Sequence, residues 1–530
     1  TNGPEAGENN MLYKNNGTGG FTKVTNDPIV QDKKPSDGAT WGDFDNDGDA
    51  DCFVATWYAV NNLFYKNKGD GTFEKITTGA FVNDLGYSET ASWGDYDNDS
   101  WLDLYVTNSG GNFKNFLYRN LHDGTFQKIT TGSPVTDAFV SRSVNWTDFN
   151  GDGKLDLFVS NEANQYENLY NGNGSFTKLT TGPLLTAGGK TISSSWGDYD
   201  NDGDQDVFLA NDEGNDGLYR YDGNETFTQI TTGPVVTSGG NSFGSEWADV
   251  DNDADLDLFV TNAYGGGPWK NFLFLNNGDG TFTKNLTEIP ATEEGWSYGC
   301  AFGDWDCDGD LDLGVATCLN ANQTDYLYEN HSAENDNNWL EIKMIGTASN
   351  RSAIGAKVWA RATIGGQQVT QFREISAQSG YCGQNQLAVH FGLADADAAT
   401  VTIKWPSGTE ELLGNFSANR CLVAVEGQGV TGVNQPTLNP SRKALALNPN
   451  PSSDSVTLAW EEEEAEIVLL QIIDLKGGVV FSEKINAASG RNEWTWNGLD
   501  SAGTKMPAGN YTVTVLGNNW QAVEQLVRVR

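Results

Sequence analysis

Short apolar runs of four residues recur along the first 330 residues at nearly constant spacing. Their β-branched and aromatic residues are typical of strands, and each run follows directly after a cluster of aspartates. Successive runs begin 50–55 residues apart, with no helical period between them. A repeat of this length indicates one all-β unit used several times. The runs are Cys52–Ala55, Leu104–Thr107, Leu157–Ser160, Val207–Ala210, Leu258–Thr261 and Leu313–Ala316.

Each apolar run is followed by two more strand-like segments joined by a tight turn. In the first repeat these segments are Leu63–Asn67 and Phe73–Thr77, and Gly69-Asp-Gly71 lies between them. An Asp-Gly pair favours a hairpin with positive φ. The segment that leads into each aspartate cluster supplies a fourth strand. Four short antiparallel strands per unit describe one blade of a β-propeller, whereas a parallel β-helix would need a much shorter period.

The number of blades depends on how the ring closes. Six complete units run from about residue 21 to residue 330. A further strand, Met11–Asn15, matches the last strand of a unit that has no beginning. We expect it to close the ring by joining strands from elsewhere in the chain, which favours seven blades, with a composite seventh, over the alternative of six.

An aromatic residue stands two positions before the first aspartate of each cluster. We interpret these residues as packing between blades rather than as a surface on which sugars stack. They are Trp41, Trp93, Trp146, Trp196, Trp247 and Phe302.

The aspartate clusters are candidate metal-binding loops. Carboxylates at every second position repel one another unless a cation lies among them, and calcium suits a crowded cage of oxygen ligands. We number each loop from its first aspartate and expect ligands at positions 1, 3, 5, 7 and 9, with a backbone carbonyl often serving at position 7. The candidates are Asp43, Asp45, Asp47, Asp49 and Asp51; Asp95, Asp97, Asp99, Trp101 and Asp103; Asp148, Asn150, Asp152, Lys154 and Asp156; Asp198, Asp200, Asp202, Asp204 and Asp206; Asp249, Asp251, Asp253, Asp255 and Asp257; and Asp304, Asp306, Asp308, Asp310 and Asp312.

The six loops are not equivalent. Position 6 is glycine in four of them but Ser100 and Ala254 in the second and fifth. If that position needs a positive φ, each exception carries about 1 kcal/mol of strain. The third loop has Asn150 and Lys154 among its ligand positions, so we expect it to bind most weakly. We expect about six calcium ions, whose main role is to brace the blades.

The remaining 200 residues predict two more all-β domains. Alternating apolar residues predict a small β domain over residues 335–427. Residues 428–447 are rich in Gly, Asn and Pro and are expected to be a linker. Residues 448–530 contain further strand-like runs and predict an Ig-like β-sandwich. The propeller is assigned to residues 1–334.

Composition and charge exclude several classes of function. The formal net charge is −40, from 72 acidic and 32 basic residues, and 27 of the acids lie in the six loops. Such a charge disfavours binding to nucleic acid or to an anionic membrane. No apolar run is long enough to span a membrane. The aromatic content of 11% and the 62 glycines fit a turn-rich β fold rather than a disordered acidic chain.

Catalytic motifs are not evident, and we expect no enzymatic activity. No nucleophile elbow, phosphate loop, HExxH or CxxC motif is present. Of the three histidines, His122 falls at a hairpin turn, His331 follows a strand, and His390 is expected to pack. Six cysteines are compatible with an oxidising compartment. The candidate disulfides are Cys382 with Cys421 and Cys300 with Cys318, while Cys52 and Cys307 are expected to be free, buried thiols.

Residues 11–330 resemble FG-GAP/VCBS repeats. The resemblance rests on the Asp-x-Asp-x-Asp-Gly-x-x-Asp loops, the Leu-Tyr-x-Asn strands and the Gly-Asp-Gly-Thr-Phe turns. Repeats of this kind form integrin α-like propellers with calcium-binding loops.

The rest of the chain has resemblances of its own. Asn350-Arg-Ser-Ala-Ile-Gly, the segment from Arg373 to Tyr381 and His390-Phe-Gly-Leu are similar to the ASPIC/UnbV domain, which follows such propellers in cartilage acidic protein-like and bacterial secreted proteins. The end of the chain, with Asn448-Pro-Asn-Pro and Pro507-Ala-Gly-Asn-Tyr, resembles a type A sorting domain of the type IX secretion system and is close to FlgD-type Ig-like modules.

These resemblances imply a secreted or cell-surface, calcium-stabilised scaffold. Its expected roles are adhesion, macromolecular binding or self-assembly, with a protein or glycan partner outside the cell and export by secretion machinery that acts on the C-terminal domain. The alternative is a carbohydrate-active protein, either a lectin or a polysaccharide lyase, that uses the propeller face. Stacking planes for that alternative would come from Trp57, Tyr58, Tyr264 and Trp269.

Overall fold

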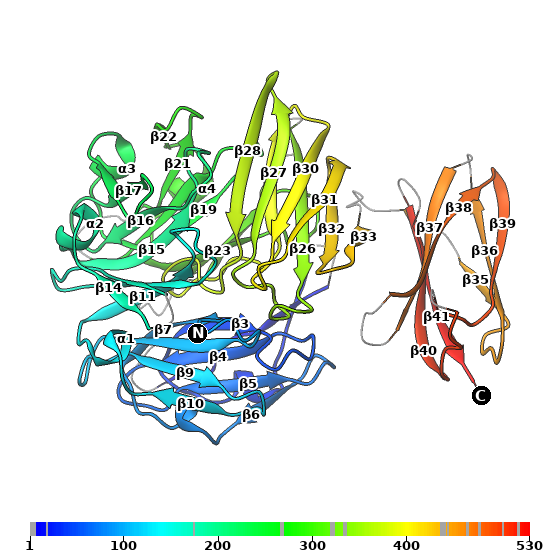
Figure 1. The fold of residues 1–530 in the computed structure, drawn as a ribbon, viewed down its shortest axis with the longest axis horizontal. Helices are drawn as coiled ribbons and strands as arrows, with labels where there is room; N and C mark the ends of the chain where they lie inside the picture. The colour runs from blue at the N-terminus through cyan, green and yellow to red at the C-terminus, as the bar shows by residue number, and fades with distance from the viewer. Residues whose placement is uncertain are drawn as a thin grey trace. The chain divides into compact units, whose positions relative to one another are not determined.

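The fold of the chain is seen in a computed structural model (Figure 1). It describes residues 7–16, 20–172, 175–264, 270–317, 324–331, 337–434, 441–442, 445–462, 466–474, 479–500, 503–516 and 520–529. The chain is all-β, as the apolar pattern predicts, and it forms two compact units, residues 1–432 and 433–530.

Six sheets of the first unit are the predicted blades. Five have four antiparallel strands, and the sixth has three among the described residues. The blades contain β3 (Ser36–Gly42), β4 (Asp51–Thr56), β5 (Leu63–Asn67) and β6 (Phe73–Ile76); β7 (Ser88–Gly94), β8 (Asp103–Asn108), β9 (Phe116–Asn120) and β10 (Phe126–Ile129); β11 (Ser141–Thr147), β12 (Asp156–Asn161), β13 (Asn168–Asn171) and β14 (Thr177–Leu179); β15 (Thr191–Gly197), β16 (Asp206–Asn211), β17 (Gly217–Tyr221) and β18 (Phe227–Ile230); β19 (Ser242–Ala248), β20 (Asp257–Asn262), β21 (Phe272–Asn276) and β22 (Phe282–Asn285); and β23 (Ser297–Gly303), β24 (Asp312–Thr317) and β25 (Tyr326–Tyr328).

The first strand of each blade packs against the first strand of the next blade along the chain, so these six strands line the axis of the propeller. A single helical turn precedes each of them and adds apolar side chains to the core between blades. These turns are η1 (Pro28–Val30), η2 (Ala80–Val82), α1 (Ser133–Thr136), α2 (Pro183–Thr186), α3 (Pro234–Thr237) and α4 (Ile289–Thr292).

The tryptophans before the loops pack between blades, as predicted. Trp146 on β11 is 2% exposed and packs in one cluster with Tyr105 of the preceding blade. Its indole N–H donates to the backbone oxygen of Ser92, 3.3 Å away on β7. Trp247 makes the equivalent bond, 3.2 Å long, to Ser195 of β15. Both residues therefore tie neighbouring blades together and offer no stacking surface for sugars.

A two-stranded sheet lies beside the sixth blade, where a seventh blade would stand. It consists of β1 (Tyr13–Asn15) and β2 (Phe21–Lys23). Asn15 donates a 2.5 Å bond to the backbone oxygen of Trp305 in the sixth loop, just as Asn330 of the sixth blade donates to Val250 in the fifth. The hairpin thus takes the place of the two outer strands of a seventh blade. Its strand Tyr13–Asn15 pairs with the adjacent β2 and, among the described residues, with no strand from elsewhere in the chain, which corrects the expected way of closing the ring.

The second β domain packs onto the propeller within the first unit. It has two four-stranded sheets, in the orders β29-β26-β32-β33 and β28-β27-β30-β31. Apolar residues alternate inward along its strands, as at Val358, Ala360 and Ala362 of β27. The strands are β26 (Asn338–Ile345), β27 (Lys357–Ile364), β28 (Gln367–Glu374), β29 (Val389–Ala394), β30 (Ala398–Lys404), β31 (Glu410–Ser417), β32 (Arg420–Val425) and β33 (Gly429–Asn434).

The second unit is a β-sandwich with its own core. Sheets in the orders β34-β41-β40-β37-β38 and β35-β36-β39 enclose apolar residues that include Trp460, Trp496 and Val513. The strands are β34 (Ser441–Arg442), β35 (Ala446–Asn448), β36 (Val456–Glu462), β37 (Glu466–Asp474), β38 (Val479–Ala487), β39 (Gly490–Trp496), β40 (Gly509–Leu516) and β41 (Trp520–Arg528).

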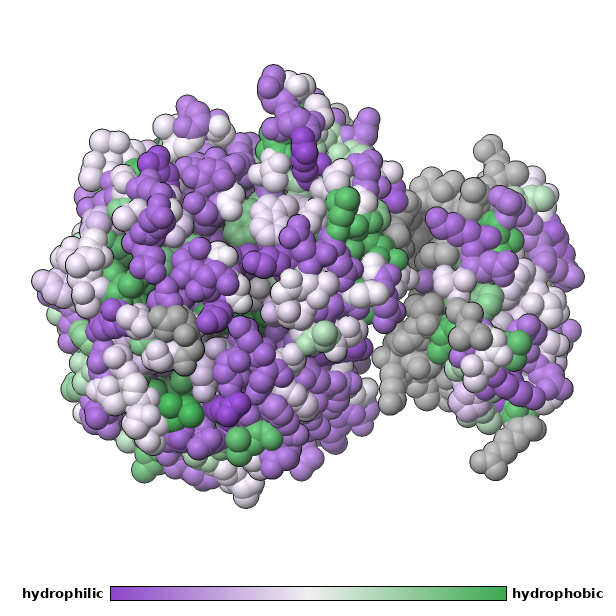
Figure 2. Space-filling model, viewed as in Figure 1, coloured by the Kyte–Doolittle hydropathy of each residue, from purple (hydrophilic) through white to green (hydrophobic). Residues whose placement is uncertain are grey.

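The face of the molecule drawn in Figure 2 is mostly hydrophilic where it is coloured, in keeping with the net charge of −40. On the face in view, apolar residues form small, scattered patches (Figure 2). Among the described residues, no helix has both the length and the apolar character needed to cross a membrane.

Candidate metal centres

The aspartate loops connect the first and second strands of each blade. In the first loop, the carboxylate of Asp43 accepts bonds from the backbone N–H groups of Asp47, at 3.0 Å, and Gly48, at 2.8 Å. Asp51 accepts a 2.7 Å bond from the backbone N–H of Asn67 on the third strand. Positions 1 and 9 therefore curl the loop and fix it to its own blade.

Position 6 adopts a left-handed backbone in every loop. Glycine serves there in four loops, with φ of 86° to 100°. Ser100 has φ 74° and Ala254 has φ 84°, so both exceptions carry the predicted strain of about 1 kcal/mol.

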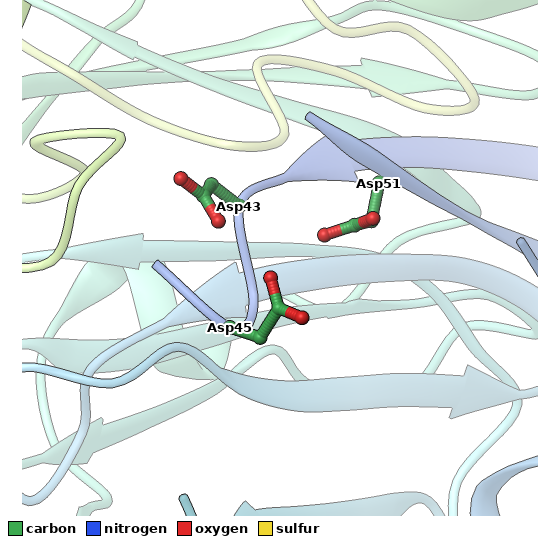
Figure 3. Close-up of side chains that lie close together, drawn as sticks. All are labelled: Asp43, Asp45 and Asp51. Atoms are coloured by element: carbon green, nitrogen blue, oxygen red, sulfur yellow. The ribbon is translucent and has the colours of Figure 1, made fainter. Parts of the chain in front are cut away.

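Carboxylates converge in five of the six loops. In the first loop, the side chains of Asp43, Asp45 and Asp51 lie close together (Figure 3), and each offers an oxygen within 4.8 Å of the others. The same closeness holds for four further groups. They are Asp95, Asp97 and Asp99; Asp198, Asp200 and Asp206; Asp249, Asp251 and Asp257; and Asp304, Asp306 and Asp308.

One oxygen in most of these groups is buried without a hydrogen-bond partner. At position 3 of the first, fourth, fifth and sixth loops, Oδ1 of the aspartate has neither a donor nor contact with solvent. Leaving a buried charged oxygen unpaired costs several kcal/mol unless a cation is bound there. The donor sets therefore fit a hard cation. The residues are Asp45, Asp200, Asp251 and Asp306.

Burial makes these carboxylates poor acids in the absence of a cation. Desolvation is the largest cause, and it raises the pKa of Asp43 to about 6, of Asp51 to about 8 and of Asp206 to about 9. Neighbouring aspartates raise these pKa values further. A divalent ion would supply the positive charge that keeps the groups ionised at neutral pH.

Basic residues on the third strands lie at the outer side of two loops. Lys66 pairs with Asp45 and Asp47, and its side chain is 32% exposed. Arg119, which is 41% exposed, lies 2.6 Å from Asp97. Because they are partly exposed, these side chains offset the loop charge from the rim.

The second β domain sits on the face that the loops form. It contacts all six of them, and the fifth loop receives two backbone N–H groups of strand β29, one from Gly392 and one from Ala394. The loops are therefore a docking platform as well as candidate ion sites. The contacts are Ser352 to Asp43, Ala348 to Ser100, Lys357 to Asp148, Glu374 to Gln205, Gly392 to Asp249, Ala394 to Asn252 and His390 to Gly309.

One segment of this domain fills the propeller axis. Residues 374–388, here called the axial segment, link β28 to β29 and reach the first strand of every blade. Gly380 and Gly383 allow the closest approach, because a Cβ atom at either would lie 2.3 Å or less from a strand backbone oxygen. The contacts are Gln384 to Trp41, Tyr381 to Glu89 and Ser193, Gln378 to Asn145, Ser379 to Glu246, and Asn385 to Phe302.

A cavity of about 140 Å³ remains beside the axial segment. It is lined by Asp198, Asp249, Arg373 and His390, among others. The guanidinium of Arg373 donates to the backbone oxygen of Phe372 and to the side chain of Gln371, and burial lowers its pKa although Asp249 and Asp198 lie nearby. His390 packs as predicted, with Nε2 3.0 Å from the backbone oxygen of Gly309 and its pKa lowered to about 4 by burial.

The third loop departs from the other five. Among the described residues it has no group of three converging carboxylates. Its first aspartate, Asp148, instead accepts a 2.8 Å bond from the ammonium of Lys357, a residue of the second β domain. Asn150 and Lys154 mark this loop as weak in the sequence, but the sequence does not identify Lys357 as its partner. The signal in the sequence is limited to a lysine at the start of an alternating apolar strand.

The remaining ligand candidates occupy the loops without joining the converging groups. Several use their side chains for bonds within the loop, as Asp47 does when it accepts a bond from the backbone N–H of Asp49. They are Asp47, Asp49, Trp101, Asp103, Asp202, Asp204, Asp253, Asp255, Asp310 and Asp312, together with the third-loop residues Asp148, Asn150, Asp152, Lys154 and Asp156.

The aromatic residues expected to stack on sugars are engaged in packing. Trp57 donates from its indole to Ser109 and meets Tyr58 and Tyr87 edge-on. Tyr264 packs against Phe243. Trp269 lies outside the described residues.

The cysteine expectations are confirmed only in part. Cys382 and Cys421 are both free thiols, because the first lies in the axial segment and the second on β32. Cys300 is also free, and its expected partner Cys318 lies outside the described residues. Cys52 is free and buried as expected, whereas Cys307 is free but exposed.

Comparison with known sequence families gives three matches. The FG-GAP-like repeat matches six overlapping segments that together cover residues 5–315, more than half of the chain. The ASPIC and UnbV domain matches residues 346–431, and the FlgD Ig-like domain matches residues 448–520. The six repeat segments are 5–54, 43–106, 95–159, 148–209, 198–260 and 255–315.

Similar proteins include cartilage acidic protein 1 of two vertebrates. The Xenopus tropicalis protein is 26% identical over 317 residues, and the human protein is 27% identical over 312 residues. The matches cover 59% and 58% of this chain but only 40% and 39% of those proteins. Among solved structures, PorZ, a surface component of the type-IX secretion system of Porphyromonas gingivalis, is 11% identical over 96% of this chain and 77% of its own, with a TM-score of 0.24.

Proposed function

The chain belongs to the FG-GAP-like repeat family, and from this premise we propose that its acidic loops bind calcium and that the protein is an extracellular or cell-surface scaffold, not an enzyme. The observation that carries the proposal is the convergence of carboxylates in five loops, with a buried, unpartnered oxygen in four of them.

Calcium is favoured by the number and type of oxygens. Each converging loop offers four or five aspartates and a backbone carbonyl, and calcium takes six to eight oxygen ligands in flexible geometry. Magnesium would need a near-ideal octahedron and would keep several waters. Outside cells, where we place the protein, modules with Kd values of about 10⁻⁴–10⁻³ M suffice to hold calcium.

Calcium would stabilise both the individual blades and the contact between the propeller and the second β domain. Within a blade it would neutralise carboxylates that join the loop to the third strand, as Asp51 joins Asn67. Between domains it would stabilise the platform that bears the second β domain, for example where Gly392 donates to Asp249. Metal binding would therefore contribute to the stability of the whole first unit.

A role as a scaffold is supported by the filled axis. Propellers that act on substrates use residues from several blades around a central channel, and here the axial segment bonds to the first strands that line it. We assign adhesion, macromolecular binding or self-assembly to the outer surface, with a protein or glycan partner. The C-terminal unit, which matches the FlgD Ig-like domain, is proposed to direct export through a type IX-like secretion route.

Thermal unfolding with and without calcium tests the proposal. Each site filled at roughly a hundred times its Kd adds about 2.7 kcal/mol to stability, so chelation with EDTA should lower the melting temperature and calcium should restore it. Magnesium at the same concentration should restore less. Identical melting curves in EDTA and in calcium would refute the calcium assignment.

A matched pair of variants assigns the effect to the loops. Asp257→Asn removes a ligand candidate from the fifth loop and should reduce the calcium-dependent rise in melting temperature. Asp397→Asn changes an exposed aspartate of the second β domain and should leave that rise intact.

A further inference from the structure

A lysine of the second β domain, Lys357, places its ammonium group against the third loop. Lys357 begins β27, and its side chain is 9% exposed. Its ammonium donates to Asp148 twice, at 2.8 Å to Oδ2 and at 2.7 Å to the backbone oxygen. The positive charge of the Lys357 ammonium thus contacts Asp148, at position 1 of this loop, within the interface between the propeller and the second β domain.

Acidic groups surround the ammonium of Lys357. On the neighbouring strand β28, Glu374 is the cross-strand partner of Lys357. Its carboxylate accepts bonds from the backbone N–H of Asp148, at 3.1 Å, and from the side chain of Gln205, at 2.9 Å. The buried lysine therefore has two acids as neighbours, which is the arrangement that makes a buried charge tolerable.

The hydrogen bonds inside the third loop also differ from those of the others. In the first, second, fourth, fifth and sixth loops, the N–H of position 5 donates to the aspartate at position 1. In the third loop, the N–H of Asp152 donates instead to Asn150, at 2.9 Å. The side-chain oxygen of Asn150, at position 3, thus accepts a hydrogen bond within the loop. In four other loops, Oδ1 of the aspartate at position 3 has no hydrogen-bond partner.

The charges in and around the third loop also disfavour a calcium ion there. The third loop has three carboxylates, together with Lys154 of the loop and Lys357 of the second β domain. The first, fourth, fifth and sixth loops have five carboxylates each. A divalent ion would gain much less Coulomb energy in the third loop than in the others.

We propose that Lys357 is the resident cation of the third loop, so that the chain binds five calcium ions and not six. This inference rests on the proposed function, since it divides the loops into five that take calcium and one that does not. The lysine ties the second β domain to the propeller at the third loop without a metal. That contact would persist when calcium is removed.

The basic residues at the rims of the first and second loops do not replace a metal ion as Lys357 does. Lys66, for example, lies on the third strand of its own blade and is 32% exposed. It reaches positions 3 and 5 rather than position 1. Its loop retains the converging group of Asp43, Asp45 and Asp51.

The inference is tested by the number of calcium ions bound per chain of residues 1–530, measured by equilibrium dialysis and native mass spectrometry. Wild type should bind five. Lys357→Met should bind six, because loss of the ammonium frees Oδ2 and the backbone oxygen of Asp148. These would join Oδ1 of Asp148 and Oδ2 of Asp156, which are buried without hydrogen-bond partners, as ligands for a metal.

Lys404→Met is the matched control and should still bind five. Lys404 is the other cross-strand partner of Lys357. Its ammonium also approaches the third loop, since it would lie 3.9 Å from a Cβ atom at Gly153. Among the described residues, however, the salt bridge to Asp148 is made by Lys357.

A second pair of variants keeps the test decisive if Lys357→Met fails to fold. Asp148→Asn should leave the count at five, whereas Asp95→Asn, at position 1 of the second loop, should lower it to four. Six ions in wild type, a count of five in folded Lys357→Met, or loss of an ion in Asp148→Asn would each overturn the inference while leaving the calcium proposal intact. Binding of no calcium by wild type would overturn the proposed function itself.

Discussion

Replacing Gly383 with alanine should loosen the axial segment. A Cβ atom at this position would lie 2.0 Å from the backbone oxygen of Cys300 on β23 and 3.0 Å from the carboxylate of Glu246. A carbon and an oxygen in ordinary contact are about 3.3 Å apart, so the two backbones must separate by about 1.3 Å. Strand β23 is held by its pairing with β24, and we therefore expect the axial segment to move.

The size of the effect follows from the cost of overpacking. Inserting a methyl group into a packed site costs about 1–3 kcal/mol. Since about 1.4 kcal/mol is a factor of ten in an equilibrium constant, opening of the axial segment should become about 5 to 150 times more frequent. Gly383 does not have a positive φ, so alanine adds no backbone strain of its own.

Hydrogen exchange followed by mass spectrometry measures this opening. The backbone N–H groups of Tyr381 and Gln386 donate to the first strands of the propeller, so peptides that contain them should exchange faster in Gly383→Ala. Gly314→Ala is the control, because a Cβ atom there would lie no closer than 3.8 Å to any neighbour. Unchanged exchange of the axial segment in Gly383→Ala would refute the close packing of this segment against β23.

Two further substitutions test the packing of the blades. Burial raises the pKa of Glu167 to about 8, so the contribution of this residue to stability is present at acidic pH and is lost as the pH rises to about 8. The free energy of unfolding of Glu167→Gln, measured in urea, should therefore increase by about 3 kcal/mol relative to that of wild type between pH 5 and pH 8. A difference in unfolding free energy that stays constant over this pH range would contradict the reasoning. Asn276→Ala removes three side-chain hydrogen bonds, two donated to the backbone oxygens of Tyr199 and Leu256 and one accepted from the backbone N–H of Gly278. It should cost about 1–3 kcal/mol in the same assay, whereas Asn277→Ala, at an exposed residue, should be nearly neutral. Equal effects of the two substitutions would contradict the role of Asn276.

The sequence predicts the blades well because their signals are local and repeated. Each apolar run, Asp-Gly turn and aspartate loop is encoded within about fifty residues. The need for a left-handed backbone at Ser100 and Ala254 is also visible, because glycine fills that position in the other four loops. The packing of Trp146 between blades follows in the same way from its fixed place before the loop.

The docking of the second β domain has no such local signal. Lys357 and Asp148 are 209 residues apart, and nothing in either segment identifies the other. The axial segment reaches all six blades through side chains that are ordinary polar residues of a loop. The expected pairing of Cys382 with Cys421 failed for the same reason, because position in one domain does not reveal that Cys382 enters the propeller axis.

A crystal structure of the full chain grown in millimolar calcium would locate the ions themselves. We predict calcium, identified by its anomalous signal and by oxygen distances of about 2.3–2.6 Å, in the first, second, fourth, fifth and sixth loops. The ammonium of Lys357 should occupy the third loop beside Asp148. Loops that hold only water at such a calcium concentration would contradict the assignment of this propeller as a calcium-binding scaffold.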